Sequence, residues 1–328
     1  VVAGSAAHLS GQSGSDREKY KRTAIISPMP ASLRQLRHEV TGRLRNRLTH
    51  TITGLPPERR EAYARRLDSN PASRALVRGA ASWYSRAPVP IAGGGLFHLL
   101  YVSTEELTLD HAHAGLIVRG TLELSVQEAL KRTLRPGAVF YDVGANVGFF
   151  TLLGSRIVGP EGRVVAFDPV PSCARAVARN IELNGMSQAE IRAVAVGAAD
   201  GRETLMVVGE ASWSHMETTR ERHRDVREEV EVDVVALDSL VASGEIPPPA
   251  VVKIDTEGAE IAIVEGMRET LAKHGPALIC ELHDTNARFA ELMDAAGYAM
   301  TNLDGPEPVR EAGAIHVLAR PRERGPSD

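Results

Sequence analysis

The sequence predicts an α/β protein with a doubly wound, mostly parallel sheet and helices on both faces. Two observations carry this prediction. From residue 139 onward, short β-favouring runs alternate with longer stretches of helical periodicity, the order of βαβ units on a parallel sheet. The first strand-to-helix turn holds glycines at positions 144 and 148, as in nucleotide-binding α/β proteins. We also expect an N-terminal helical appendage and a β insertion.

Length and composition restrict the class of protein. The chain has 328 residues, of which 43% are hydrophobic, enough for one large α/β domain with an appendage. Its two cysteines, Cys173 and Cys280, are too few for a disulfide framework and lack a metal-ligand spacing, which is typical of a reducing compartment. We find neither a signal-peptide pattern nor an apolar run of the roughly 18 residues that a membrane span needs. We therefore expect a cytoplasmic protein.

Charge is distributed unevenly along the chain. Residues 1–90 hold sixteen Lys and Arg against six Asp and Glu, a balance of +10 that leaves −14 for the rest of a chain with net charge −4. The arginines recur with apolar residues at helical intervals and with few aromatics, which favours a solvated helical face over nucleic-acid binding. The predicted organisation is a disordered or tag-like segment at 1–30, a helical appendage at 31–88 that acts as a lid or in homodimerisation, a main domain at 89–320 and a tail at 321–328.

The elements of the main domain follow from periodicity and turn signals. A capping-box pattern, Ser125-Val126-Gln127-Glu128, opens a helix that runs to about Leu134. The predicted strands are 139–143, 163–167, 191–196, 251–255, 277–282, 298–303 and 314–319, and the later helices are 172–184, 259–273, 286–296 and one that starts near 148.

An insertion interrupts this alternation after the third strand. Residues 204–208 and 229–234 alternate apolar and acidic or polar side chains, as half-exposed antiparallel strands do. Between them lies the charged run 220–229, which we interpret as a solvated loop or helix face rather than as a mobile lid.

The turn Asp142-Val143-Gly144-Ala145-Asn146-Val147-Gly148 is the strongest functional signal. Gly144 permits a tight turn, and Gly148 lets the backbone approach a ligand at the start of a helix. The next strand leads to Asp168, twenty residues past Gly148, where a carboxylate can accept hydrogen bonds from both ribose hydroxyls. These features predict a cofactor with a nucleoside; the alternative is a structural turn in which Asp168 caps the following helix.

Two cofactors suit this turn, a dinucleotide and S-adenosylmethionine. In the dinucleotide pattern G-x-G-x-x-G the helix N-terminus faces a pyrophosphate, but here Asn146 occupies the place of the middle glycine. A carboxylate at Asp142, two residues before Gly144, would repel a pyrophosphate and attract a cationic ammonium and sulfonium. The charges therefore favour S-adenosylmethionine, and an NAD(P)-dependent oxidoreductase is the alternative.

Six motifs follow one another along the chain: Gly120-Thr121-Leu122-Glu123, Phe140–Gly148, Ala166-Phe167-Asp168-Pro169, Asn180–Asn184, Val235–Leu240 and Val252–Glu260. In this order they resemble the motifs of the FkbM-type methyltransferases, a Rossmann-like, S-adenosylmethionine-dependent family. The resemblance spans about residues 89–320, and Asp168 stands where a glutamate is frequent in such proteins. It implies a class I methyltransferase fold with a seven-stranded sheet, and O-methylation of a hydroxyl on a sugar, polyketide or other secondary metabolite; a nitrogen or carboxyl acceptor is the alternative.

The turn and the resemblance together predict where the cofactor binds. Glu123 is expected to reach the methionine end of the cofactor, although a glutamate flanking a helix is nearly as good an interpretation. The complete set of predicted cofactor-binding residues is Glu123, Asp142, Gly144, Ala145, Asn146, Gly148, Asp168 and Pro169.

The catalytic residues are expected at the carboxyl ends of the strands, where open α/β sheets bind ligands. Methyl transfer is an in-line displacement, so the enzyme must align an oxygen nucleophile and remove its proton. Lys253, Asp255 and Glu257 occupy alternate positions at that edge and share one face if the strand stays extended. The alternative is a structural network of ion pairs.

Two histidines are candidate bases because imidazole titrates near neutral pH. His283 ends the strand after Asp255, and His215 lies in the insertion. Either one can instead be a surface or structural histidine, and our order of candidates is His283, Asp255, His215. Asp255, Glu257 and Glu281 could gather Mg²⁺, but no metal-ligand spacing supports this, so we predict no metal site.

Overall fold

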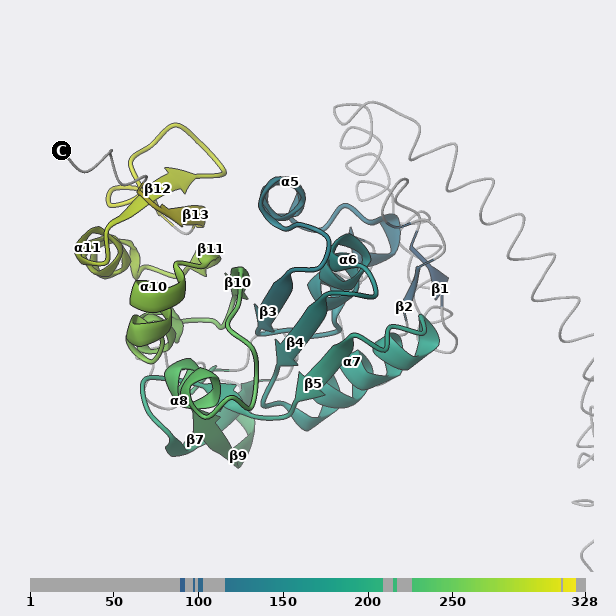
Figure 1. The fold of residues 1–328 in the computed structure, drawn as a ribbon. Helices are drawn as coiled ribbons and strands as arrows, with labels where there is room; N and C mark the ends of the chain where they lie inside the picture. Colours follow the sequence, from purple (N-terminus) through teal and green to yellow (C-terminus); the bar gives the residue numbers. More distant parts are fainter. Residues whose placement is uncertain are drawn as a thin grey trace, which may run out of the picture. The chain divides into compact units, whose positions relative to one another are not determined.

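The computed structural model describes residues 89–91, 97, 100–102, 116–208, 215–216, 226–313 and 315–322 (Figure 1). All of them belong to the second of two compact units, Leu48–Asp328. The predicted helical appendage at 31–88 and the segment at 1–30 lie outside the described residues, as does most of the tail.

A seven-stranded sheet forms the centre of the described domain. Its order is β12-β13-β11-β10-β3-β4-β5, and every pair from β11 to β5 is parallel, whereas β13 is antiparallel to both of its neighbours. This confirms the mostly parallel seven-stranded sheet and the class I methyltransferase fold. The strands are β3 (Val139–Val143), β4 (Arg163–Phe167), β5 (Ala189–Arg192), β10 (Val251–Ile254), β11 (Ala277–Leu282), β12 (Tyr298–Asn302) and β13 (Ile315–Pro321).

Helices cover both faces of this sheet (Figure 1). On one face lie α5 (Leu124–Thr133), α6 (Phe149–Val158) and α7 (Pro171–Leu183), which contact one another in sequence order. On the other lie α8 (Leu237–Ala242), α9 (Glu260–Glu265), α10 (Arg268–His274) and α11 (Asn286–Ala295). The central strands are almost wholly buried because both of their faces are covered, which explains their continuous apolar runs. A two-stranded ribbon, β1 (Val89–Pro90) with β2 (Tyr101–Val102), precedes α5.

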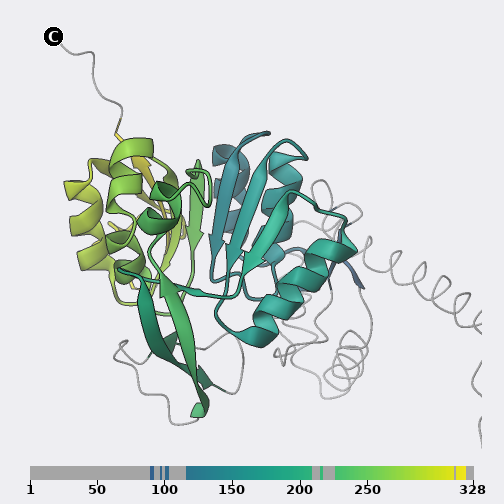
Figure 2. The same ribbon diagram turned by 60° about the horizontal axis from the view of Figure 1, so that its bottom comes forward.

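The insertion is a second, four-stranded sheet of order β6-β9-β7-β8. Its long hairpin, β7 (Gly201–Val208) with β9 (Val226–Val235), is antiparallel, as predicted, and projects away from the main sheet (Figure 2). The predicted single strand 191–196 is wrong, because β5 ends at Arg192 in the main sheet and β6 (Ala195–Val196) pairs with β9 in the second. β8 (His215–Met216) pairs with β7. The predicted loop or helix at 220–229 is wrong in its last residues, because β9 begins at Val226.

The predicted helix 259–273 is two helices, α9 and α10, separated at Gly266 and Met267. Gly266 packs against the main-chain carbonyl of Gly197, so closely that a Cβ atom would collide with it. Asp238 then fixes the start of α10, because its carboxylate accepts hydrogen bonds from the backbone N–H groups of Glu269 (2.8 Å) and Thr270 (2.7 Å). A tertiary contact therefore divides a helix that the local sequence favours.

The predicted capping box is also wrong. The N-cap of α5 is Glu123 rather than Ser125, and it makes no side-chain cap hydrogen bond. Ser125 lies within the helix, and its hydroxyl donates to Asp304 at 2.8 Å. The start of α5 is thus tied to the loop after β12.

The hydrophobic core fills the space between the sheet and its helices. Phe140, Tyr141, Phe149 and Phe167 are almost inaccessible to solvent, and burial of each such side chain stabilises the fold by about 1.5–3 kcal/mol. Among the described residues, no helix has both the length and the apolarity needed to cross a membrane.

Candidate active site

The turn between β3 and α6 has the conformation that its glycines predict. Gly144 and Gly148 have φ angles of +78° and +83°, and Gly148 is the N-cap of α6. A Cβ at Gly144 would collide with the carbonyl of Asp255, so this position requires glycine for its dihedral angle and for its close contact.

Four backbone N–H groups of the turn are occupied within the protein. Those of Gly144 and Ala145 donate to the carbonyl of Phe167 at 3.0 and 3.1 Å, and that of Gly148 donates to the carbonyl of Ala145 at 2.7 Å. The N–H of Asn146 donates to Asp168 at 2.8 Å. A pyrophosphate would need such donors to be free, and these four are not.

Asp168, which follows β4 and precedes Pro169, joins this turn to the next helix. One carboxylate oxygen accepts the N–H of Asn146, and the other accepts the N–H of Val170 at 3.0 Å. The N-cap of α7 is Val170, so Asp168 is not the cap residue itself. Burial raises the pKa of Asp168 to about 7, against the opposing effect of the two N–H donors.

Buried acceptors without a partner mark the same region. Among the described residues, Asn146 Oδ1 and Thr256 Oγ1 are shielded from solvent and have no hydrogen-bond partner. Thr256 lies beside the turn, because its methyl group would contact a Cβ at Gly144. Unsatisfied buried polar atoms are rare in native proteins and call for an explanation such as a ligand.

Asp142 is fully buried, and it faces Lys253 across β3 and β10, where the two residues are register partners. Thr151 donates to Asp142 Oδ2 at 2.6 Å, and Lys253 Nζ lies 4.0 Å from Oδ1. Burial raises the pKa of Asp142 even though Lys253 opposes the shift. The negative charge predicted to attract a cationic cofactor is therefore shared with Lys253, and a contact between Asp142 and the cofactor stays a prediction.

Lys253 connects Asp142 with Asp255. Its Nζ donates to Asp255 Oδ2 at 2.9 Å and lies 4.9 Å from the centre of the Phe150 ring. Burial lowers the pKa of Lys253, but the carboxylates of Asp255 and Asp142 outweigh it and hold the pKa above its ordinary value. Burial raises the pKa of Asp255, but Lys253 outweighs burial and holds that pKa below its ordinary value. Lys253 has an exposed fraction of 3% and its contacts fit the structural network that was the alternative interpretation, while a catalytic role for it stays a prediction.

Glu257 does not share a face with Lys253 and Asp255 as an extended strand would require. The strand ends at Ile254, and Glu257 has a φ angle of 50°, in the left-handed region. Its carboxylate lies 3.4 Å from His283 Nε2 instead. The expectation that three alternating side chains share one face is therefore correct for Lys253 and Asp255 and wrong for Glu257.

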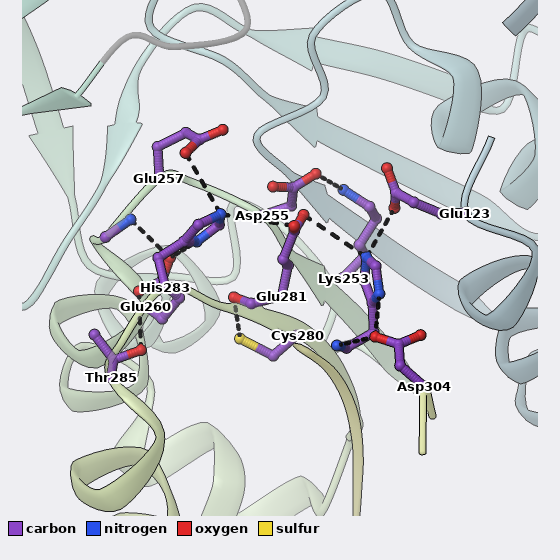
Figure 3. A network of polar contacts seen from close by, with 12 residues as sticks. Glu123, Lys253, Asp255, Glu257, Glu260, Cys280, Glu281, His283, Thr285 and Asp304 are labelled. Atoms are coloured by element: carbon purple, nitrogen blue, oxygen red, sulfur yellow. Dashed lines mark hydrogen bonds and ion pairs between the residues drawn. The ribbon is translucent and has the colours of Figure 1, made fainter. Parts of the chain in front are cut away.

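His283 lies among three carboxylates, which Figure 3 shows as Glu257, Glu260 and Glu281. Its Nδ1 is 3.0 Å from Glu260, and its Nε2 is 3.4 Å from Glu257 and 3.6 Å from Glu281. The hydrogen bond to Glu260 outweighs burial and, with the other two charges, raises the pKa of His283 to about 9. These carboxylates favour the protonated imidazole, and a catalytic role for His283 stays a prediction.

Glu281 lies between Asp255 and the last strand of the chain. It shares a hydrogen bond with Asp255, and it is the register partner of His316 in β13. Burial and the charge of Asp255 raise the pKa of Glu281 to about 8. One edge of the sheet thus carries Asp255, Glu281 and His316 on three neighbouring strands.

Glu123 approaches this edge from the start of α5. Burial and the charge of Asp255 raise its pKa to about 7, while Lys253 opposes the shift. Its Oε2 atom lies 3.6 Å from His316 Nε2. The alternative interpretation of Glu123 as a surface residue flanking a helix is wrong, because its side chain is largely buried, and its predicted contact with a cofactor stays a prediction.

Backbone strain gathers at the same place. Four described residues other than glycine have left-handed φ angles. Each of them lies in the cofactor turn, at the carboxyl edge of the sheet or next to that edge. They are Glu123, Asn146, Glu257 and Asp284.

Sequence reasoning missed three residues at this edge, namely Glu260, Asp304 and His316. Glu260 is fully buried and holds His283, and Asp304 Oδ2 is 2.8 Å from His316 Nδ1. A histidine within the apolar run 315–319 was the available signal. His215, by contrast, lies in β8 opposite Met206, in the second sheet, and its side chain is outside the described residues, so its role stays a prediction.

The comparisons with known proteins decide the family. Residues 142–302 match the family model described as the methyltransferase FkbM domain. The chain belongs to the FkbM-type methyltransferase family. It is therefore an enzyme that transfers methyl groups.

Three relatives show how this FkbM-type chain compares. It is 27% identical over 218 residues to the 31-O-demethyl-FK506 methyltransferase FkbM of Streptomyces tacrolimicus, covering 58% of this chain and 84% of that protein. It is 26% identical over 145 residues to the hexuronic acid methyltransferase AglP of Haloferax volcanii, and this match covers 44% of this chain and 56% of that protein. The solved methyltransferase FkbM of Methylobacillus flagellatus KT is 16% identical, with a TM-score of 0.39, covering 66% of this chain and 56% of that one.

Proposed function

We propose that this FkbM-type methyltransferase uses S-adenosylmethionine to methylate a hydroxyl group of a sugar or another natural product. Two of the relatives have names that state an acceptor: one names position 31-O of demethyl-FK506, and the other a hexuronic acid. Both names support an acceptor that is a small molecule or glycoside. None of the three relatives compared above is an oxidoreductase, so the NAD(P) alternative has no support from them.

The observation that carries the proposed cofactor is the closed turn between β3 and α6. The N–H groups of Gly144, Ala145, Asn146 and Gly148 are used inside the protein, which disfavours a pyrophosphate. The turn nevertheless offers acceptors, because Asn146 Oδ1 is unpaired among the described residues, and the four lone pairs of the Asp168 carboxylate exceed its donors, the N–H groups of Asn146 and Val170 and the thiol of Cys173. Acceptors suit the ribose hydroxyls, the adenine amino group and the ammonium of S-adenosylmethionine.

Each predicted cofactor residue has a place in this proposal. Gly144, Ala145 and Gly148 let the main chain pass close to the ligand, and Asp168 with Pro169 lies where the ribose is held. Asp142 supplies negative charge toward the methionine end, and so does the Glu123 oxygen that does not face His316. When bound, S-adenosylmethionine supplies a methyl group on a positively charged sulfur.

The acceptor hydroxyl is proposed to bind beside Asp255. Lys253 fixes one oxygen of this carboxylate, and the edge of the sheet leaves about a quarter of the side chain exposed. Both nitrogens of His283 already face carboxylates, the donor arrangement of an imidazolium, which has no free lone pair. We therefore place Asp255 before His283 as the group that aligns the hydroxyl and accepts its proton.

The proposal is tested by isothermal titration of the purified protein with S-adenosylmethionine and, separately, with NAD⁺ and NADP⁺. We expect binding of the first ligand only, and incubation with a panel of glycosides and polyketides to give a product heavier by one methyl group. Asp168→Ala should weaken cofactor binding, and Arg268→Ala, an exposed control on α10, should not. Folded protein that binds a dinucleotide and not S-adenosylmethionine would overturn the proposal.

A further inference from the structure

We propose that Glu123, Glu281 and His316 form a binding site for one divalent transition-metal ion of the zinc class. These residues come from the start of α5, from β11 and from β13, elements that are far apart in the sequence. One oxygen or nitrogen atom from each lies within 4.8 Å of the other two. The sheet itself sets part of this geometry, because Glu281 and His316 are register partners across an antiparallel pair of strands.

Two of the three ligand atoms have no other partner. Among the described residues, Glu123 Oε2 and His316 Nε2 are shielded from solvent and make no hydrogen bond. They lie 3.6 Å apart, and Glu281 Oε2 is 3.7 Å from the same His316 nitrogen. When both carboxylates are ionised and the imidazole nitrogen is unprotonated, all three atoms are acceptors, and in a buried place they are costly unless a cation lies between them.

A second layer of hydrogen bonds orients the histidine. Asp304 Oδ2 is 2.8 Å from His316 Nδ1 and also accepts the backbone N–H of His316 at 2.8 Å. Asp304 Oδ1 accepts the hydroxyl of Ser125 at 2.8 Å. A carboxylate on one imidazole nitrogen fixes the proton there and turns the lone pair of the other nitrogen toward the metal, as in most protein metal sites. Figure 3 shows Glu123 and Asp304 on the same side of the polar network.

The ligands and their spacing favour zinc over magnesium. One imidazole and two carboxylates are a donor set for Zn²⁺ or Mn²⁺, whereas Mg²⁺ prefers oxygen ligands and water. Bonds of about 2.0–2.1 Å at tetrahedral angles put ligand atoms about 3.4 Å apart. The separations of 3.6 and 3.7 Å are too long for hydrogen bonds and need only a slight contraction to match.

The second cluster at this edge, Asp255 with Glu281 and His283, is the weaker candidate. There Lys253 already neutralises Asp255. At the Glu123 site, Glu123 Oε2 and His316 Nε2 are shielded from solvent and make no hydrogen bond among the described residues. We therefore place the ion between Glu281, Glu123 and His316 and not between Glu281, Asp255 and His283.

Three protein ligands leave at least one coordination position open. A hydroxyl oxygen bound there would have a lowered pKa, which assists its deprotonation. This use of the ion rests on the proposed function, but the binding of the ion does not.

The experiment measures metal binding directly, in the absence of S-adenosylmethionine. The whole protein is dialysed against a chelator and titrated with Zn²⁺ by calorimetry, and with Co²⁺ by absorption spectroscopy. We expect one ion per chain, a tetrahedral cobalt spectrum, and affinity that falls about 10–100-fold in Asp304→Asn and further in His316→Ala. His274→Ala, a control that removes an exposed histidine of α10, should bind zinc like the wild type.

Circular dichroism and titration with S-adenosylmethionine show for each variant whether the fold and the cofactor site survive. Glu281→Gln keeps the size of the side chain and serves if His316→Ala does not fold. Folded wild-type protein that binds no stoichiometric ion, or the same zinc affinity in wild type, His316→Ala and Glu281→Gln, would contradict the metal site. Neither result would bear on S-adenosylmethionine binding, which is measured separately.

Discussion

Gly144 lies against the main-chain carbonyl of Asp255, with no space for a Cβ atom between them. The contact joins the predicted cofactor turn to the predicted acceptor position, since Gly144 follows β3 and Asp255 follows the neighbouring β10. The backbone N–H of Asp255 also donates to the carbonyl of Val143 at 3.1 Å. The spacing between the two halves of the site is thus set by main-chain packing.

Gly144→Ala should therefore lower the free energy of unfolding by more than the left-handed φ angle alone explains. Gly137 provides a matched control, because it also has a φ of +78° and a Cβ there would meet nothing within 4 Å. We expect Gly137→Ala to lower the free energy of unfolding by about 1–2 kcal/mol, the cost of a left-handed non-glycine residue. Gly144→Ala should lower it further and should weaken S-adenosylmethionine binding, as measured by urea unfolding and calorimetry. Equal effects of the two substitutions would show that the contact has no consequence.

Asp168 should make cofactor binding depend on pH. Its pKa is raised to about 7 by burial, so the carboxylate is largely protonated at pH 6 and ionised at pH 8. If the ionised form accepts the ribose hydroxyls, the dissociation constant for S-adenosylmethionine should be about tenfold larger at pH 6 than at pH 8. Calorimetry at several pH values measures this change.

Asp168→Asn is the control for that pH dependence, because other carboxyl groups at the sheet edge also titrate near neutral pH. The variant has no charge to lose, so its binding should be weaker at pH 8 and nearly independent of pH. An unchanged pH slope in Asp168→Asn would assign the dependence to another group, such as Glu123 or Glu281.

Gly266→Ala tests why the helix at 260–274 is broken. Alanine favours a helix by about 1 kcal/mol over glycine, so local propensity predicts that the substitution stabilises the protein. The packing of Gly266 on the carbonyl of Gly197 predicts the opposite, a loss of about 1–3 kcal/mol through overpacking. Gly201→Ala is a control in open space and should change stability little. Chemical unfolding distinguishes the two signs.

The difference between local propensity and contacts with distant residues explains which parts of the fold could be predicted from the sequence. The bounds of β3, β4 and β11 follow from local apolar runs between turn signals, and the structure has them as predicted. The division at Gly266, the change of sheet after Arg192 and the pairing of Ser125 with Asp304 depend on residues that are distant along the chain. Local periodicity contains no information about such contacts.

In the candidate site, too, some contacts follow from the local sequence and others depend on residues that are distant along the chain. Lys253 and Asp255 were predictable as neighbours because alternate residues of one strand share a face. The pairing of Glu281 with His316 was not, because it depends on the register of an antiparallel strand that follows 35 residues later. The environment of His283 also escaped prediction, since Glu257, Glu260 and Glu281 surround it only after the strand has ended and the chain has turned.

Lys253→Met should be strongly destabilising because it leaves Asp142 and Asp255 without their shared cation. Removal of one member of a buried ion pair costs about 3–5 kcal/mol, since the remaining charge is buried and unpaired. Lys273→Met, which removes an exposed lysine paired with Glu269, should change the free energy of unfolding little, because solvent screens that pair. Adding Asp142→Asn to Lys253→Met removes one of the unpaired carboxylates and should restore part of the loss. Urea unfolding of the single and double variants measures this coupling, and strictly additive losses would mean that Asp142 and Lys253 do not interact across the strands.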